Sequence, residues 1–302
     1  MITKPDGLKI PPLKEIQEGI DELLLIEDWN NYKIKRNPKR FQKRLHQLFT
    51  SKFSVFPTIL TLIDTNNFPF TFFRLRKFDS KMNTSLISEY SYPPNHVVKY
   101  TQRANLPYHP VFYCSNDPST AIFETIRNEK AHNPNDVYYL SSWEFKPDQT
   151  INFSPFIFGN LSKDSPYKKW TEISYLQIDK SLGHEFDKET LNSLKKILEF
   201  LSHLFVFENT YAVSSYIAHE HLYADHNYRS DIFMYPSWQT DRKSLNFAIH
   251  PNSVTEKMRL KKVYKMTISD FTEDKKSYSA TISKVAHNKN GILYWQQKIT
   301  KN

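Results

Sequence analysis

The sequence predicts a mixed α+β fold, with a largely antiparallel or split sheet, flanking helices and a preceding N-terminal helical segment. Helical periodicity dominates two segments before residue 65, whereas short apolar runs typical of strands take over from about residue 68. These strands and later helices follow one another without the regular strand–helix–strand repetition of a doubly wound sheet. We therefore expect an N-terminal helical extension over residues 1–65 and a larger domain over residues 66–302.

The first two helices are predicted from their apolar spacing. Residues 12–28 place apolar side chains at helical intervals opposite an acidic face. Residues 37–53 predict a second helix, with Asn37 as its cap and Pro38 in its first turn. From residue 33 to residue 52 there are many Lys and Arg and no acidic residue. We interpret the basic face as solvated or as paired with the acidic helix.

Downstream, runs rich in apolar or alternating residues predict strands, and the last run is expected to close the sheet. The predicted strands are 69–78, 111–115, 137–145, 231–237, 245–251, 259–271 and 276–285. Longer amphipathic or capped segments predict helices at 118–130, 186–205 and 211–223. Asp117 followed by Pro118 is a typical cap and first residue for the helix at 118–130.

Composition narrows the classes of function. The chain has 302 residues, 39% hydrophobic and 15% aromatic, which is typical of a globular protein. Its 5 glycines are scattered, which excludes a Walker loop or a glycine-rich dinucleotide fingerprint. The net charge of +9 favours anionic partners, including nucleotides and nucleic acid. The single cysteine, Cys114, lies in an apolar run and predicts a buried structural thiol.

We expect a cytoplasmic protein that does not contact a membrane, because the sequence has neither a signal-peptide pattern nor a bilayer-length apolar run. We expect no metal. His219 and His221 are two residues apart on a predicted helix and therefore point to different sides. Ser214 and Ser215 have no base at a spacing that suggests a hydrolase triad.

Two stretches carry candidate site residues. Arg103, Tyr113 and Glu124 fall on a loop, a strand and a helix in quick succession. A guanidinium suits phosphate, and a glutamate in a cleft can accept hydrogen bonds from sugar hydroxyls and offset positive charge on a ribose. Ser237 and Asn246 stand at facing strand ends, where they donate to a ligand or simply form turns. Spacing alone leaves open a surface arginine, a core tyrosine and a solvated glutamate.

Together these stretches resemble the RES-domain family, which is named for a spatially grouped Arg, Glu and Ser. The family pattern is Arg-x-Asn, Pro-Val-x-Tyr, a helix with the Glu, and Tyr-Pro-Ser followed by an Asn. The matching pieces are Arg103-Ala104-Asn105, Pro110-Val111-Phe112-Tyr113, Glu124, Tyr235-Pro236-Ser237 and Asn246, and FFRLRK at 72–77 resembles the opening strand with Arg74 or Arg76 as its arginine. Family members often have a glycine where this chain has Leu106-Pro107-Tyr108-His109.

The resemblance implies an ADP-ribosyltransferase-like fold and cleavage of NAD+ between nicotinamide and ribose, by hydrolysis or phosphate attack. NAD+ is then the substrate, and no further cofactor is expected. Many family members are toxins held in check by a helix-turn-helix antitoxin encoded beside them, which makes such a protein the expected partner; a homodimer is left open. The implied catalytic residues are Arg103, Glu124 and Ser237, and the implied substrate-binding residues are Tyr113, Asn246, Arg74 and Asn105.

Two alternatives remain open at the level of sequence. The same site is compatible with transfer of ADP-ribose to a macromolecule. The basic segment also suits a nucleic-acid or partner-binding module on a degenerate enzyme fold, although we favour a solvated face because its aromatic residues fit the apolar side of the helix. The basic residues concerned are Lys35, Arg36, Lys39, Arg40, Lys43 and Arg44.

Overall fold

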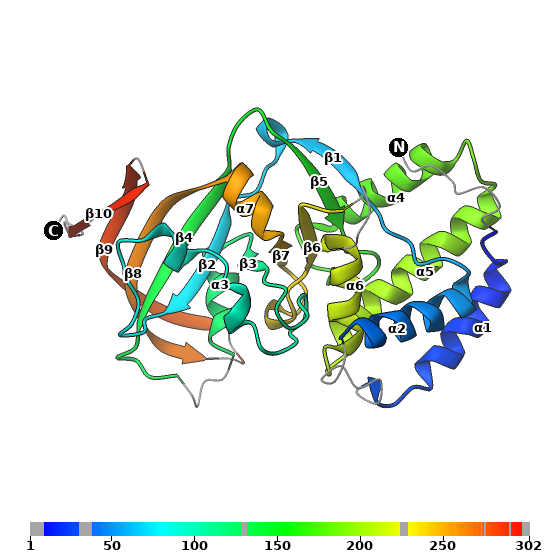
Figure 1. Cartoon of the computed structure of the whole chain (residues 1–302), viewed down its shortest axis with the longest axis horizontal. Coiled ribbons are helices and arrows are strands. Elements are labelled where there is room, and N and C mark those ends of the chain that lie inside the picture. The colour runs from blue at the N-terminus through cyan, green and yellow to red at the C-terminus, as the bar shows by residue number, and fades with distance from the viewer. Residues whose placement is uncertain are drawn as a thin grey trace.

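The computed structural model describes residues 9–29, 38–127, 132–223, 229–272, 274, 276–289 and 291–297. Within these ranges it has seven α-helices and ten strands, which confirms the predicted mixed α+β class (Figure 1). The helices are α1 (Leu13–Leu24), α2 (Pro38–Phe53), α3 (Pro118–Thr125), α4 (Lys168–Leu182), α5 (Lys188–Phe207), α6 (Ala212–Leu222) and α7 (Pro251–Lys257). The strands are β1 (Thr61–Asp64), β2 (Phe72–Lys77), β3 (Phe112–Ser115), β4 (Val137–Phe145), β5 (Thr150–Pro155), β6 (Ile232–Pro236), β7 (Leu245–Ile249), β8 (Met258–Thr272), β9 (Ser277–Lys289) and β10 (Ile292–Gln297).

All ten strands belong to one sheet in the order β1-β5-β6-β7-β3-β2-β4-β8-β9-β10. Every neighbouring pair is antiparallel except β5 and β6, which are parallel. In the middle of the sheet, β2 and β3 pair only at Phe73 and Ser115. The two halves of the sheet, β1-β5-β6-β7-β3 and β2-β4-β8-β9-β10, are therefore joined by this single pairing.

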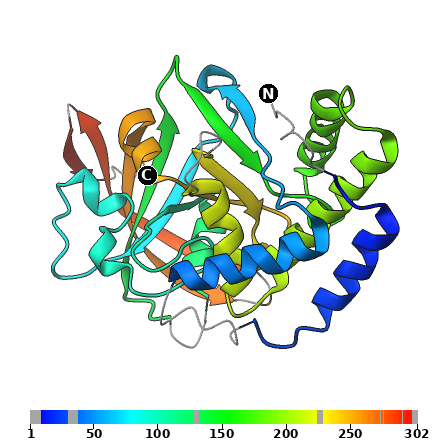
Figure 2. The ribbon, with the colours of Figure 1, turned by 45° about the vertical axis from the view of Figure 1, so that its right-hand side comes forward.

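Helices α1, α2, α4, α5 and α6 lie together at the β1–β6 end of the molecule, away from β8–β10 (Figure 1). In α2 the side chains of Phe41, Leu45, Phe49 and Phe53, spaced four residues apart, are all buried. They share one hydrophobic cluster with apolar residues of α5 and α6. Helix α2 lies beside α6 in both views (Figures 1 and 2), so the N-terminal helices and the later helices share a core.

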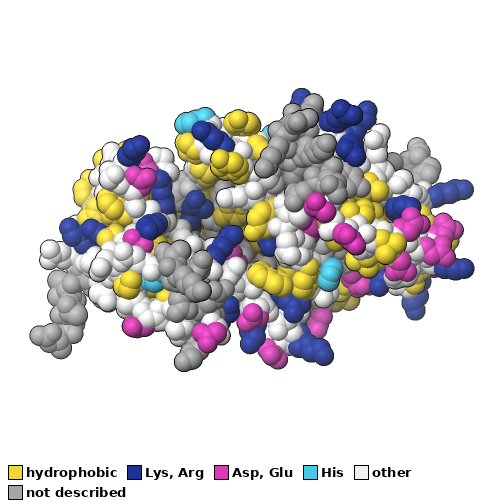
Figure 3. Space-filling model, turned by 90° about the horizontal axis from the view of Figure 1, so that it is seen from below, with side chains coloured by type: hydrophobic (Ala, Val, Ile, Leu, Met, Phe, Trp, Pro, Cys, Tyr) yellow, Lys and Arg dark blue, Asp and Glu magenta, His cyan; other side chains and the backbone are white. Residues whose placement is uncertain are grey.

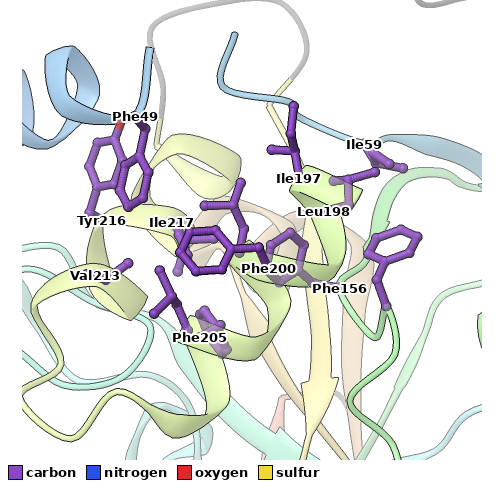
Figure 4. Packing of buried hydrophobic residues seen from close by; sticks show 14 of the residues in the cluster. Phe49, Ile59, Phe156, Ile197, Leu198, Phe200, Phe205, Val213, Tyr216 and Ile217 are labelled. Carbon is purple, nitrogen blue, oxygen red and sulfur yellow. The ribbon is translucent and has the colours of Figure 1, made fainter. Parts of the chain in front are cut away.

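The aromatic contacts in this cluster are close. The rings of Phe49 and Tyr216 stack with centroids 6.1 Å apart, and Figure 4 shows them face to face. His46 Nδ1 forms a 3.0 Å hydrogen bond with the Tyr216 hydroxyl, which gives the buried phenol a polar partner. Lys52 of α2 also forms an ion pair with Glu22 of α1. One ion pair therefore joins the basic helix to the acidic helix, in line with one of the two interpretations given for the basic face.

Several elements differ from the sequence-based prediction. The last predicted strand, 276–285, does not close the sheet, because β10 pairs with the outer side of β9 and forms the edge. The helix predicted over 118–130 is helical only to Thr125, and residues 128–130 lie outside the described ranges, as does the predicted cap Asn37. Residue 251, predicted to end a strand, instead begins α7, since Pro251 suits a first helical position. Helix α4 and strands β1, β5 and β10 had no clear signal in the sequence.

The basic side chains are spread over the surface. On the face that Figure 3 shows, Lys and Arg side chains lie between acidic and apolar ones and do not form a single patch. Several basic residues form an ion pair with an acidic residue, namely Arg76, Lys77, Lys195, Lys257 and Arg259.

No helix in the described ranges has the length and apolar character needed to cross a membrane.

Two partly buried histidines, His109 and His219, lie between α6 and the segment before β3. The ring of His219 lies 4.9 Å from that of His109 and 5.4 Å from that of Tyr223, centroid to centroid. Burial and, to a lesser extent, the charge of the neighbouring His109 lower the pKa of His219 to about 3. Its Nδ1 atom is buried and has no hydrogen-bond partner among the described residues. Burial also raises the pKa of Glu220, the next residue along the chain, to about 7.

We expect His219 to make the fold acid-sensitive. The unfolded chain binds a proton at His219 below pH 6.5 while the folded protein does not, so stability falls as pH drops below that value. The loss at pH 5 is roughly 2 kcal/mol for this group. Denaturant unfolding at pH 7.5 and pH 5 should therefore show a smaller acid-induced loss for His219→Phe than for the wild type. Protonation of Glu220 has the opposite effect on stability as pH falls. This effect is the same in His219→Phe and the wild type, so it does not change the difference between them.

The exposed His184 provides the control, since His184→Phe removes a histidine that is not buried. This variant should lose as much stability on acidification as the wild type. An equal loss in His219→Phe and the wild type would contradict the prediction.

Candidate active site

A pocket of about 530 Å³ opens beside α3, where β3 and β7 meet the segment that joins α5 to α6. Its size lies in the ordinary range for small-molecule sites. Five predicted site residues line it: Arg74, Arg103, Tyr113, Glu124 and Asn246. Residues separated by up to 172 positions in the chain are thus brought to one cavity. Ser237 is fully buried and reaches the same place through a hydrogen bond to Glu124.

The position of Glu124 follows from how α3 begins. The Asp117 side chain caps the helix by accepting a hydrogen bond from the Thr120 amide at 2.9 Å, and Pro118 stands in the first turn. Ala121 and Ile122 are buried in a cluster beneath the helix. Glu124 consequently projects from the side of α3 into the pocket, where its side chain keeps 21% of its exposure.

Two donors hold one oxygen of this carboxylate. Ser237 Oγ donates to Glu124 Oε1 at 2.7 Å, and Asn246 Nδ2 donates to the same atom at 2.6 Å. Because Tyr235 pairs with Asn246 in the register of β6 and β7, the two donors stand at neighbouring strand ends. Ser115 Oγ donates to Asn246 Oδ1 at 2.7 Å, which orients the amide. The two side chains that the sequence indicated as donors to a ligand, Ser237 and Asn246, are therefore directed at Glu124.

Arg103 is anchored on the C-terminal end of α5. Its Nη1 donates to the carbonyl oxygens of Phe205 at 2.5 Å and Val206 at 2.9 Å, and its guanidinium lies 5.2 Å from the centre of the Tyr211 ring. Carbonyls at a helix C-terminus favour a cation. Arg103 forms no ion pair with an acidic side chain in the described ranges. Its positive charge is therefore not neutralised by a carboxylate.

Arg74 fills the opening between β2 and β3. Its Nη1 donates to the Tyr113 carbonyl oxygen at 2.9 Å, in a region where the two strands no longer pair. Its guanidinium lies 5.7 Å from the centre of the Phe112 ring, and burial lowers the pKa of Arg74 to about 10. Arg74 borders this pocket and also a larger one of about 1170 Å³. It is the residue at which the two cavities adjoin.

Tyr113 contributes its ring, because its hydroxyl is already engaged. The hydroxyl donates to Asn105 Oδ1 at 2.9 Å and accepts from the Ala104 amide at 2.8 Å. Burial raises the pKa of Tyr113, so the phenol stays neutral. Asn105 is itself 3% exposed and is absent from the pocket wall. Its contact is with Tyr113, and any effect on a ligand must pass through that ring.

Sequence reasoning missed four residues that belong to the site. Ser115 orients Asn246, and Arg127 Nη2 lies 3.7 Å from Glu124 Oε2. Tyr211 and Trp238 also line the pocket. The only available signal was the spacing of three between Glu124 and Arg127 on one helix, which favours contact. The others depend on which strands and loops meet.

The loop that departs from the RES pattern has a consequence in the backbone. Tyr108 has a φ of 65°, in the left-handed region that favours glycine. Its side chain is 60% exposed and does not line the pocket. Tyr108 therefore adopts a backbone conformation typical of glycine at a local cost in strain, and its side chain does not fill the cavity.

Comparison of the chain with protein-family models and with curated protein sequences finds no match.

Among the residues that the structure describes, no three His, Cys, Asp or Glu side chains form a group suited to a metal ion. Cys114 is buried, and burial raises the pKa of its thiol well above the ordinary value. Such a thiol is a poor nucleophile.

The charges at the site favour a specific chemistry. Three arginines, Arg74, Arg103 and Arg127, line the pocket together with one carboxylate, Glu124. The guanidinium groups suit an anionic ligand such as a diphosphate. The single carboxylate suits a reacting centre that becomes positively charged.

Proposed function

We propose that the protein cleaves the bond between nicotinamide and ribose in NAD+, in the manner of RES-domain enzymes and on an ADP-ribosyltransferase-like fold. The observation that carries the proposal is the fixed carboxylate: Glu124 Oε1 accepts from both Ser237 and Asn246, in a pocket that Arg74, Arg103 and Arg127 also line. Among the residues that the structure describes, Glu124 Oε2 has only the 3.7 Å contact to Arg127 and can face a substrate.

In the proposed reaction the C1′–N bond breaks, and its electron pair stays on the nicotinamide nitrogen, which leaves as a neutral ring. The ribose becomes oxocarbenium-like, and the negative charge of Glu124 offsets the positive charge that develops there. Glu124 Oε2 accepts a hydrogen bond from a ribose hydroxyl, while Arg103 and Arg127 hold the diphosphate. Water or phosphate then attacks C1′; in hydrolysis the water proton passes to solvent.

The test is release of free nicotinamide from NAD+ by the purified protein. We expect time-dependent release with ADP-ribose as the coproduct in phosphate-free buffer. If phosphate raises the rate and ADP-ribose-1″-phosphate forms instead, the acceptor is phosphate. Absence of nicotinamide release under both conditions would contradict the proposed function.

A further inference from the structure

Trp238 is an exposed aromatic residue on the pocket wall. Its side chain is 48% exposed, and among the exposed large apolar residues of the described ranges it alone lines the pocket. It follows directly after Ser237, which holds Glu124. A single exposed aromatic residue is common on protein surfaces, but the place of Trp238 on the pocket wall makes its ring surface accessible to a bound ligand.

The loop around Trp238 holds it in one place. Trp238 begins a short 3₁₀ helix, Trp238–Thr240, and its carbonyl oxygen accepts from the Asp241 amide at 3.0 Å. The Arg242 amide donates to the Ser237 carbonyl oxygen at 2.8 Å. Asp241 and Arg242 have φ values of 52° and 62°, so this turn is strained.

Packing fixes the indole itself. The ring of Phe207, the last residue of α5, meets the Trp238 ring edge to face, with centroids 5.2 Å apart. Arg242 lies 5.2 Å from the centre of the Phe207 ring, and His203 stacks on Phe207 at 4.3 Å. Trp238 is therefore a rigid platform with an open surface, which reduces the entropy cost of stacking a flat ring on it.

The exposure of the residues around the pocket indicates which ring of a dinucleotide would stack on Trp238. Ser115 and Tyr235 are buried, and the side chain of Glu124 is 21% exposed. Arg103 and Arg127 are only partly covered, and Trp238 is at the solvent side with the exposed Asn209. A substrate with its reacting ribose at Glu124 and its diphosphate at the arginines directs its second nucleoside toward the exposed rim.

The geometry points to Trp238 as the stacking platform for the adenine ring, which makes the pocket selective for a dinucleotide over a mononucleotide. This inference rests on the proposed function for the identity of the reacting end. Stacking of a base on an aromatic side chain is sequence-tolerant, strong and typical of exposed aromatic platforms. Trp238 contributes to binding and not to the bond-breaking step.

The experiment compares Trp238→Ala, Trp238→Phe and wild type with NAD+ and with nicotinamide mononucleotide, which lacks the adenosine half. Trp238→Ala should raise KM for NAD+ by about 5- to 150-fold with little change in kcat. Trp238→Phe should restore most of the affinity, and KM for the mononucleotide should not change. An equal rise in KM for both substrates, or no rise for NAD+, would overturn the assignment.

Binding of ADP-ribose, measured by calorimetry, separates this inference from the proposed function. Should the wild type release no nicotinamide, the proposed reaction is wrong, but Trp238→Ala is still expected to weaken ADP-ribose binding. If wild type and Trp238→Ala bind ADP-ribose with equal affinity, Trp238 is not the stacking platform, whether or not the protein cleaves NAD+. Tyr294→Ala is the matched control, since Tyr294 is a 52% exposed aromatic outside the pocket, and it should leave both measurements unchanged.

Discussion

Replacing Glu124 with Gln is expected to lower kcat for nicotinamide release by about 10²- to 10⁴-fold. The amide oxygen of Gln can still accept the hydrogen bonds from Ser237 and Asn246, so the side chain keeps its place. It loses the negative charge that offsets the developing oxocarbenium ion. KM for NAD+ should change far less than kcat, because the charge interaction strengthens only as the bond breaks. Steady-state assays of nicotinamide release provide the measurement.

A control for the loss of one acidic residue is Glu256→Gln, in an exposed position on α7 outside the pocket. Its kcat should equal that of the wild type. The denaturant midpoints of both variants should lie close to the wild-type value, which shows that the pocket stays folded. A folded Glu124→Gln variant with the wild-type kcat would contradict the proposed mechanism.

Most helices and strands that have a clear local pattern of apolar residues were predicted from the sequence. The strand at 137–145 matches β4 residue for residue, and the amphipathic segment at 186–205 became α5 with a shift of two residues. Helix α4 was missed because only Ser174, Ile178 and Leu182 of it are buried, too few for a clear apolar stripe. The edge position of β10 was missed because strand order depends on long-range pairing, which no local pattern reports.

For the site, the sequence indicated residue types but not their contacts. Arg103, Glu124, Ser237 and Asn246 were singled out from a motif, and the structure places them around one cavity. That Ser237 and Asn246 share one oxygen of Glu124 depends on the register of β6 against β7, which the sequence does not fix. Asn105 illustrates the same limit, since its side chain contacts the Tyr113 hydroxyl and not the cavity. Trp238 had no motif at all and was found only through its exposure.

Phe49→Ala is expected to cost about 3–5 kcal/mol in the free energy of unfolding. The Phe49 side chain is fully buried on α2 and packs against Trp29, Phe53, Phe56 and Tyr216. Removing its ring leaves a cavity between α2 and α6 that rigid aromatic neighbours cannot easily fill. Denaturant unfolding followed by circular dichroism gives the change, and the exposed Gln47→Ala in the same helix should lie within about 0.5 kcal/mol of the wild type.

The shape of the transition tests whether residues 1–65 behave as a separate extension. The cluster around Phe49 continues into α5 and α6, and the end of α5 supplies the carbonyl oxygens that hold Arg103. We therefore expect Phe49→Ala to shift one cooperative transition, with nicotinamide release lost over the same denaturant range. An early, separate loss of helical signal with activity retained would show instead that α1 and α2 unfold independently of the site. A single shared transition makes the N-terminal helices part of the structure that holds Arg103 in place.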